Sequence, residues 1–130
     1  MKRKILVIED NEQNLYLIRF ILEDGGYEVL SAKDGREGVE MAATRLPDLI
    51  LLDIQLPDMD GYTTARALRE NADLNRTPIV AVTSYAMPGD REKALASGFS
   101  GYIEKPIDPD TFEAQVSQYI AAKNRQRSRP

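Results

Sequence analysis

Short, unbroken hydrophobic runs alternate along the chain with longer segments whose hydrophobic residues recur at helical spacing. The runs predict five β-strands, at residues 5–8, 27–32, 49–52, 79–82 and 101–103. The helical patterns occupy residues 13–24, 36–45, 62–70 and 88–96, and a last segment that begins at Asp108 or Asp110. Most strand runs are continuous, as in strands buried on both faces of a parallel sheet. The alternation predicts a doubly wound α/β domain with a five-stranded parallel sheet and helices on both faces, because a barrel would need about 250 residues.

The predicted helices carry recognisable end signals and inward faces. Asn11 is the expected N-cap of the first helix, with Asn14 as the alternative, and Pro88 suits the first position of the fourth helix. Residues expected to face inward are Leu15, Ile18, Leu22, Val39, Met41, Ala42, Ala43, Ala65, Leu68, Phe112, Val116, Tyr119 and Ile120. Tyr16 and Phe20 lie on a helix that is apolar nearly all round, so core positions and an exposed patch for a partner helix both fit them.

The composition excludes several kinds of chemistry. The 130 residues are 42% hydrophobic and 29% charged, which is typical of one globular domain. A formal net charge of −4 argues against a general nucleic-acid-binding protein. No hydrophobic run approaches the ~20 residues that a membrane span needs, so we expect a cytoplasmic protein without a membrane partner. The absence of cysteine and histidine excludes disulfides, thiolate nucleophiles, imidazole bases and the usual zinc sites.

Chemically reactive side chains follow the predicted strands at their carboxyl ends. They are Glu9 and Asp10 after the first strand, Asp53 after the third, Thr83 after the fourth and Lys105 after the fifth. Because the carboxyl ends of parallel strands share one edge, these side chains meet if the strands are neighbours. Three carboxylates at one place repel one another unless a cation lies between them, and oxygen ligands without imidazole or thiolate favour Mg²⁺. A threonine hydroxyl and a lysine ammonium suit the oxygens of a phosphoryl group.

These landmarks together resemble the receiver domain of two-component response regulators. They are Glu9–Asp10, Asp53 in D-I-Q-L-P-D-M-D-G, Thr83 in V-T-S, and Lys105–Pro106 at the end of Y-I-E-K-P. The match spans residues 4–121, and residues 81–90 are further similar to stand-alone receivers of the DivK type. The resemblance implies a flavodoxin-like, CheY-like sheet of strand order 2-1-3-4-5 and a receiver domain over residues 1–122. The remaining residues, 123–130, are basic and predict a solvated helix end or tail, with a contact to an acidic partner or a linker to further chain as alternatives.

The resemblance implies a phosphoacceptor and a magnesium site. Asp53 would take a phosphoryl group from a phosphohistidine on a histidine kinase or a histidine phosphotransfer protein. Mg²⁺ would be bound by the carboxylates of Asp10 and Asp53 and by the backbone carbonyl of Gln55, while Glu9 would bind it through a water molecule. A carboxylate is a weak nucleophile, so a metal ion and a lysine that neutralise charge agree with this assignment.

The resemblance also implies a switch. Lys105 and Thr83 would bind the phosphoryl group, and Tyr102 would change its rotamer as Thr83 moves. The bond between Lys105 and Pro106 is expected to be cis. Nearly two added negative charges would then shift the surface made by the fourth helix, fifth strand and fifth helix towards a second state.

The implied function is phosphorelay signalling by a regulator that is not an enzyme beyond its own phosphorylation and dephosphorylation. It would act through a downstream protein, as a monomer or weak dimer, and no output module is expected after the last helix; a receiver fragment of a longer regulator or hybrid kinase is the alternative. A small phosphohydrolase with an aspartyl-phosphate intermediate would usually carry a second aspartate where this chain has Gln55. A nucleotide carrier would need a phosphate-binding loop where residues 9–12 are acidic. Asp58 and Asp60 are expected to be turn residues and not ligands.

Overall fold

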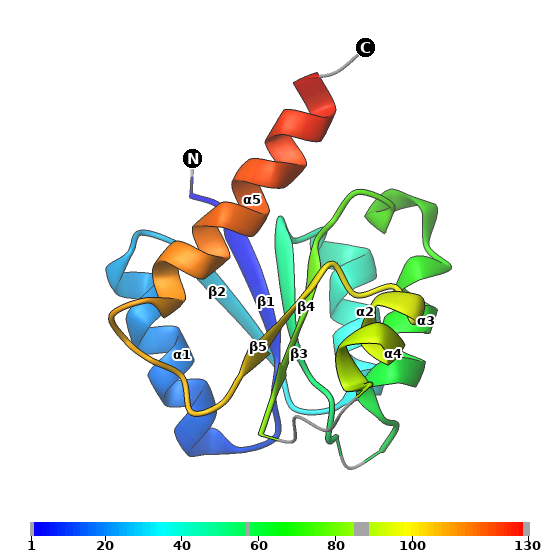
Figure 1. Cartoon of the computed structure of the whole chain (residues 1–130), viewed down its shortest axis with the longest axis horizontal. Helices are drawn as coiled ribbons and strands as arrows, with labels where there is room; N and C mark the ends of the chain where they lie inside the picture. The colour runs from blue at the N-terminus through cyan, green and yellow to red at the C-terminus, as the bar shows by residue number, and fades with distance from the viewer. Residues whose placement is uncertain (1, 57, 85–88, 129–130) are drawn as a thin grey trace.

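The computed structural model describes residues 2–56, 58–84 and 89–128, with side chains described as far as Ala122. Strands and helices alternate through these residues (Figure 1). The strands are β1 (Lys4–Ile8), β2 (Glu28–Ala32), β3 (Leu49–Asp53), β4 (Ile79–Thr83) and β5 (Gly101–Glu104). The helices are α1 (Glu12–Asp24), α2 (Gly35–Arg45), α3 (Gly61–Arg69), the short 3-10 helix η1 (Ala72–Leu74), α4 (Asp90–Ala96) and α5 (Phe112–Ser128).

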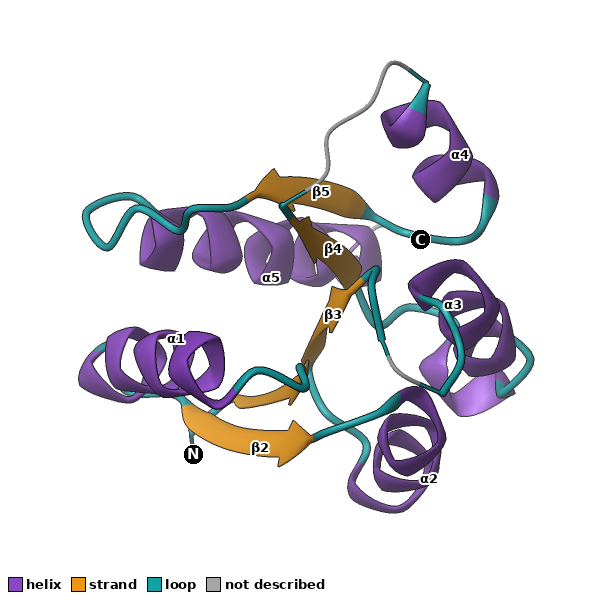
Figure 2. Cartoon of the chain, turned by 90° about the horizontal axis from the view of Figure 1, so that it is seen from below, coloured by secondary structure: helices purple, strands orange, loops and turns teal. Residues whose placement is uncertain are grey.

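The strands form one parallel sheet in the order β2-β1-β3-β4-β5. Helices α1 and α5 lie on one side of this sheet, and α2, α3 and α4 lie on the other (Figure 2). This is the doubly wound arrangement that the alternating pattern predicts, with the predicted strand order. The first and third strands are neighbours at the centre, so the side chains that follow them lie close together.

Each central strand contributes to two separate hydrophobic clusters. In β3, Leu49 and Leu51 belong to the cluster under α1 and α5, whereas Ile50 and Leu52 belong to the cluster under α2, α3 and α4. All four side chains are buried. A strand packed on both faces needs apolar residues at every position, and for this reason these strands are continuous hydrophobic runs in the sequence.

Two helix starts and one inward position differ from the sequence prediction. Helix α4 begins at Asp90, after Gly89 with a φ of 89°, and Pro88 lies outside the described residues. Helix α5 begins only at Phe112, because the carboxylate of Asp108 accepts the backbone N–H of Asp110 in a turn before the helix. Ala43 is exposed, since α2 instead buries its glycines and Ala42 against the sheet.

The structure of helix α1 shows whether Tyr16 and Phe20 are core residues or an exposed patch. Asn11 is its N-cap and accepts the backbone N–H of Asn14. Ile18, Ile21 and Leu22 are buried, whereas Tyr16 and Phe20 are 72% and 63% exposed. The pair therefore forms a surface patch and is not part of the core. None of the helices in the described part of the chain combines the length and hydrophobicity that a bilayer span requires.

Candidate functional site

Three carboxylates meet where β1 and β3 end. One oxygen from each of Glu9, Asp10 and Asp53 lies within 4.8 Å of the other two. Glu9 and Asp53 are only 3% and 7% exposed, whereas Asp10 is exposed to solvent. Burial raises the pKa of Glu9, and the neighbouring Asp53 carboxylate raises it further, while the ammonium of Lys105 acts in the opposite direction. The concentrated negative charge calls for a cation.

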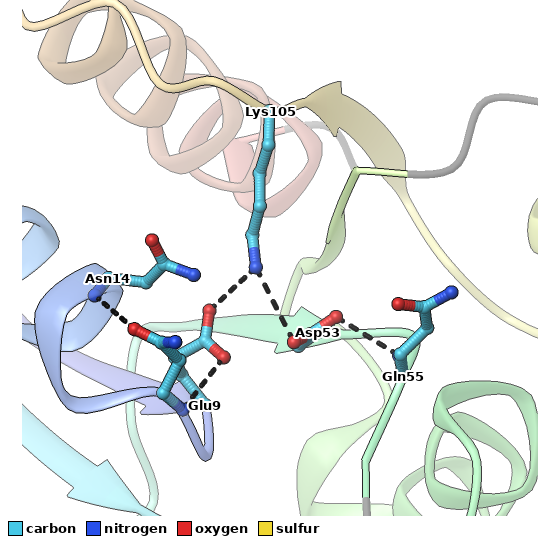
Figure 3. A network of polar contacts seen from close by, with 6 residues as sticks. Glu9, Asn14, Asp53, Gln55 and Lys105 are labelled. Atoms are coloured by element: carbon cyan, nitrogen blue, oxygen red, sulfur yellow. Dashed lines mark hydrogen bonds and ion pairs between the residues drawn. The ribbon is translucent and has the colours of Figure 1, made fainter.

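Lys105 supplies a positive charge from the end of β5. Its ammonium nitrogen Nζ lies 2.8 Å from Glu9 Oε1 and 3.4 Å from Asp53 Oδ2 (Figure 3). Its side chain is 10% exposed, so both ion pairs are shielded from water. The backbone N–H of Lys105 donates to the carbonyl of Thr83, and the Lys105–Pro106 bond is cis. The chain thus leaves β5 with Lys105 directed across the sheet edge towards the acids.

The loop after β3 orients Asp53. The backbone N–H of Gln55 donates to Asp53 Oδ1 at 3.0 Å, so each oxygen of the Asp53 carboxylate accepts one contact (Figure 3). The N–H of Gly61 closes the loop onto the carbonyl of Ile54 at 2.8 Å. A Cβ at Gly61 would lie 2.5 Å from the Cα of Ile54, so only glycine permits this approach. The side chain of Gln55 itself is exposed.

The other two aspartates of this loop, Asp58 and Asp60, accept backbone hydrogen bonds at the starts of helices. Asp60 caps α3, accepting the N–H of Thr63 at 2.7 Å. Asp58 reaches α2, and its two oxygens accept the N–H groups of Gly35 at 2.8 Å and Arg36 at 3.0 Å. Accepting backbone hydrogen bonds lowers the pKa of Asp58, through Gly35 first, and the pKa of Asp60, through Thr63 first. The contact of Asp58 with α2 was not predicted, since no local pattern relates residues 23 positions apart.

Thr83 and Tyr102 belong to the face of the sheet opposite to Asp53. Strand alternation places Thr83 in the row of Ile79 and Ala81, on the side of α2, α3 and α4, whereas Asp53 continues the row of Leu49 and Leu51 on the α1 and α5 side. Thr83 is buried at the end of β4. Tyr102 pairs with Ala81 across the strands and packs against the second cluster, and burial raises its pKa.

Tyr102 also lines a cavity of about 150 Å³. The other walls come from α4, through Arg91 and Leu95, and from α5, through Tyr119. Leu95 is among the few large hydrophobic side chains that are mainly exposed in the described residues. The surface made by α4, β5 and α5 is therefore hollowed and partly apolar, with Tyr102 in its wall.

The residues at the sheet edge fit a hard divalent cation. The cluster offers carboxylate oxygens, and the chain contains no imidazole or thiolate to draw a softer metal. Mg²⁺ is bound in proteins by one or two carboxylates and keeps several waters, so a site open on the side of the exposed Asp10 suits it. Of the predicted site residues, the structure brings together Glu9, Asp10, Asp53, Lys105 and the backbone N–H of Gln55. Thr83 ends the neighbouring strand β4, and Tyr102 lies within β5.

Comparisons with known proteins agree with this geometry. The model of the family described as "Response regulator receiver domain" matches residues 5–117. The chain is 38% identical over 120 residues to the polar-differentiation response regulator DivK of Brucella anthropi. The matched region covers 92% of this chain and 98% of the relative.

Solved structures of receiver and chemotaxis response regulator proteins are also similar to this chain. The receiver domain of a sensor histidine kinase from Pseudomonas aeruginosa, whose structure has a magnesium ion in its active site cleft, is 35% identical with a TM-score of 0.86 over 93% of this chain and 99% of that one. The chemotaxis protein CheY4 of Vibrio cholerae is 29% identical with a TM-score of 0.87, over 92% of this chain and 99% of that one.

Proposed function

The chain belongs to the response regulator receiver domain family of two-component phosphorelays, and from this membership we propose that Asp53 is the residue that receives the phosphoryl group. The observation that carries the proposal is the environment of its carboxylate. Asp53 is buried at a strand end, lies beside Glu9 and Asp10, and accepts contacts from Lys105 Nζ and the Gln55 N–H.

The proposed transfer needs little from the protein beyond position and charge. An oxygen of Asp53 attacks the phosphorus of a phosphohistidine, a P–O bond forms as the P–N bond breaks, and the departing imidazole nitrogen keeps the electron pair and takes a proton. Lys105 lies within reach of Asp53 Oδ2, so its ammonium can follow the negative charge from the carboxylate onto the phosphoryl oxygens.

Asp10, Asp53 and the carbonyl of Gln55 would hold Mg²⁺, with Glu9 reaching it through a water. When bound, the metal ion neutralises charge on the acceptor and on the phosphoryl oxygens. The three clustered carboxylates support this ligand set, and so does the magnesium ion in the active site cleft of the similar Pseudomonas receiver.

Signal output is proposed to run through the opposite face of the sheet. Thr83 would move onto the phosphoryl group, and Tyr102 would turn within the cavity between α4 and α5. A change of that surface would alter the binding of a downstream protein. The donor would be a histidine kinase or a histidine phosphotransfer protein. The receiver boundary at residue 122, the monomeric or weakly dimeric state and the cytoplasmic location stay predictions.

The test is labelling with a small phosphodonor. Purified wild type, Asp53→Asn and the control Asp73→Asn, an exposed aspartate of η1, are incubated with acetyl phosphate and Mg²⁺ and analysed by intact-protein mass spectrometry. We expect one added phosphoryl group on the wild type and on the control and none on Asp53→Asn. Stoichiometric label on Asp53→Asn would refute the assignment, and turnover of a phosphomonoester well above the rate of label loss would indicate a phosphohydrolase.

A further inference from the structure

Asp58 makes a contact that joins the loop after β3 to a different part of the fold. Both of its carboxylate oxygens accept backbone N–H groups at the start of α2, at 2.8 Å from Gly35 and 3.0 Å from Arg36. Helix α2 already has a cap of its own, because Asp34 accepts the N–H of Glu37 at 2.9 Å. The contact from Asp58 is thus a second one, made from 23 residues away.

The contact anchors Asp58, in the same loop as Gln55. Earlier in this loop, the N–H of Gln55 donates to Asp53 Oδ1, and the carbonyl of Ile54 accepts the N–H of Gly61. Asp58 follows Gln55 by three positions in the sequence. The loop that contains Gln55 is therefore anchored by three described contacts: the Gln55 N–H on Asp53, the Ile54 carbonyl on Gly61, and Asp58 on the start of α2.

The start of α2 is a firm support for this contact. A Cβ at Gly35 would lie 2.5 Å from Thr64 Oγ1 of α3 and 2.8 Å from Cγ of Met59 in the loop. Gly35 and Thr64 are both buried. The helix start, the loop and α3 are therefore packed against one another without spare room, so Asp58 is anchored to a rigid group of atoms.

We propose that Asp58 is a positioning residue for the divalent-cation site, and that by holding the backbone of Gln55 it sets the preference of the site for Mg²⁺ over the larger Ca²⁺. The inference rests on the proposed function, in which the carbonyl of Gln55 is a metal ligand. Mg²⁺ demands near-octahedral ligands at about 2.0–2.1 Å, whereas Ca²⁺ accepts varied geometry at about 2.3–2.6 Å. A loosened carbonyl ligand costs the binding of Mg²⁺ more than that of Ca²⁺.

The experiment compares binding of the two ions without any phosphodonor. Wild type and Asp58→Ala are titrated with MgCl₂ and with CaCl₂ by isothermal calorimetry, and circular dichroism confirms that each variant is folded. We expect Asp58→Ala to weaken Mg²⁺ binding about 10-fold, in the range seen when partners that orient metal ligands are removed, and to change Ca²⁺ binding less than about 3-fold. The Mg²⁺ affinity of Asp58→Asn, which keeps one acceptor oxygen, should lie between those of wild type and Asp58→Ala.

Two control variants separate the proposed cause from simpler ones. Asp34→Ala removes the other cap of the same helix start without touching the loop, and Asp60→Asn removes one negative charge from the same loop without releasing α2. We expect both to keep the wild-type ratio of Mg²⁺ to Ca²⁺ affinity. An equal loss for both ions in Asp58→Ala, or the same change of ratio in either control, would overturn the inference.

The titrations also distinguish an incorrect metal site from an incorrect role of Asp58. If wild type binds no Mg²⁺, or if Asp10→Asn binds it as tightly as wild type does, the metal site itself is wrong and the role of Asp58 is refuted with it. If wild type binds Mg²⁺ and Asp10→Asn does not, while Asp58→Ala keeps the wild-type ratio, only the positioning role is refuted.

Discussion

Glu9 and Lys105 are joined by a buried ion pair of 2.8 Å, which is shorter than the 3.4 Å contact of the same ammonium with Asp53. The extra methylene of glutamate relative to aspartate carries its carboxylate further from β1 towards Lys105. In the proposed metal site, Lys105 and Mg²⁺ would share the carboxylate of Glu9. Glu9 would reach the metal ion through a water while it stays paired with Lys105, and its negative charge would assist cation binding in either arrangement.

Replacing Glu9 by glutamine is expected to weaken Mg²⁺ binding. The substitution removes a negative charge from the cluster, and Lys105, without its nearest partner, pairs more closely with Asp53 and competes with the metal there. At the effective dielectric of a protein edge the loss corresponds to about 10-fold or more in affinity. Calorimetric titration with MgCl₂ measures it. Glu12→Gln, an exposed glutamate at the start of α1, is the matched control, and equal affinities in the two variants would contradict the expectation.

The exposed aromatics of α1 are expected to contact the phosphodonor protein. Tyr16 and Phe20 are exposed on the helix that begins shortly after Glu9 and Asp10, so a partner that covers both Asp53 and α1 would contact them. The double change Tyr16→Ser, Phe20→Ser should leave labelling by acetyl phosphate unchanged and slow transfer from a phosphorylated histidine kinase. Stability should change little, because neither side chain is buried. Leu46→Ser, an exposed leucine elsewhere, is the control, and unchanged transfer in the double variant would exclude the contact.

Arg69 is expected to be a major source of stability away from the site. Its guanidinium donates to the carbonyls of Gly98, Leu74 and Thr77 and to the hydroxyl of Ser100. It thereby ties together the ends of α3, η1 and α4. Arg69→Leu should lower the free energy of unfolding by about 2–4 kcal/mol, because several carbonyls lose a charged donor. Urea unfolding measures this loss, and the exposed Arg66→Leu on the same helix should cost less than about 0.5 kcal/mol.

Acid should remove the contribution of the loop carboxylates to stability. The folded-state pKa values of Asp58 and Asp60 lie below the ordinary value of 3.8, because their charged forms accept backbone N–H groups. Their contribution is therefore complete above about pH 4 and is lost as the pH falls through the folded-state pKa values. The difference in unfolding free energy between wild type and Asp60→Asn should shrink across that window. A difference that stays constant from pH 6 to pH 3 in urea titrations would show that the charge is irrelevant.

The strands and the acidic edge could be predicted because their causes are local. A strand buried on both faces must be apolar throughout, as residues 49–52 are, and the charged residue that follows must lie at the sheet edge. A parallel sheet places Glu9, Asp53 and Lys105 at the same edge, and the order of the strands brings them close together. The order of the strands followed from the resemblance to receiver domains, and the sheet has that order.

What could not be predicted depends on contacts between distant parts of the chain. Asp58 looks like any turn aspartate, and its partners at the start of α2 become neighbours only after folding. The outward position of Phe20 could not be predicted from the periodicity of α1, because that helix is apolar nearly all round. The sequence predicts an earlier start for α5 than the structure shows, because the carboxylate of Asp108 accepts the N–H of Asp110 in a turn before the helix.

The division of β3 between two hydrophobic clusters limits which insertions and deletions the sequence of this protein can accept in evolution. Inserting or deleting one residue between Leu49 and Leu52 would send every later side chain of the strand to the opposite layer, and Asp53 would turn away from Glu9 and Lys105. Connecting loops tolerate changes of length, but this strand does not. Its length is therefore expected to be invariant among functional variants of this chain, even where all four of its hydrophobic residues are exchanged for others.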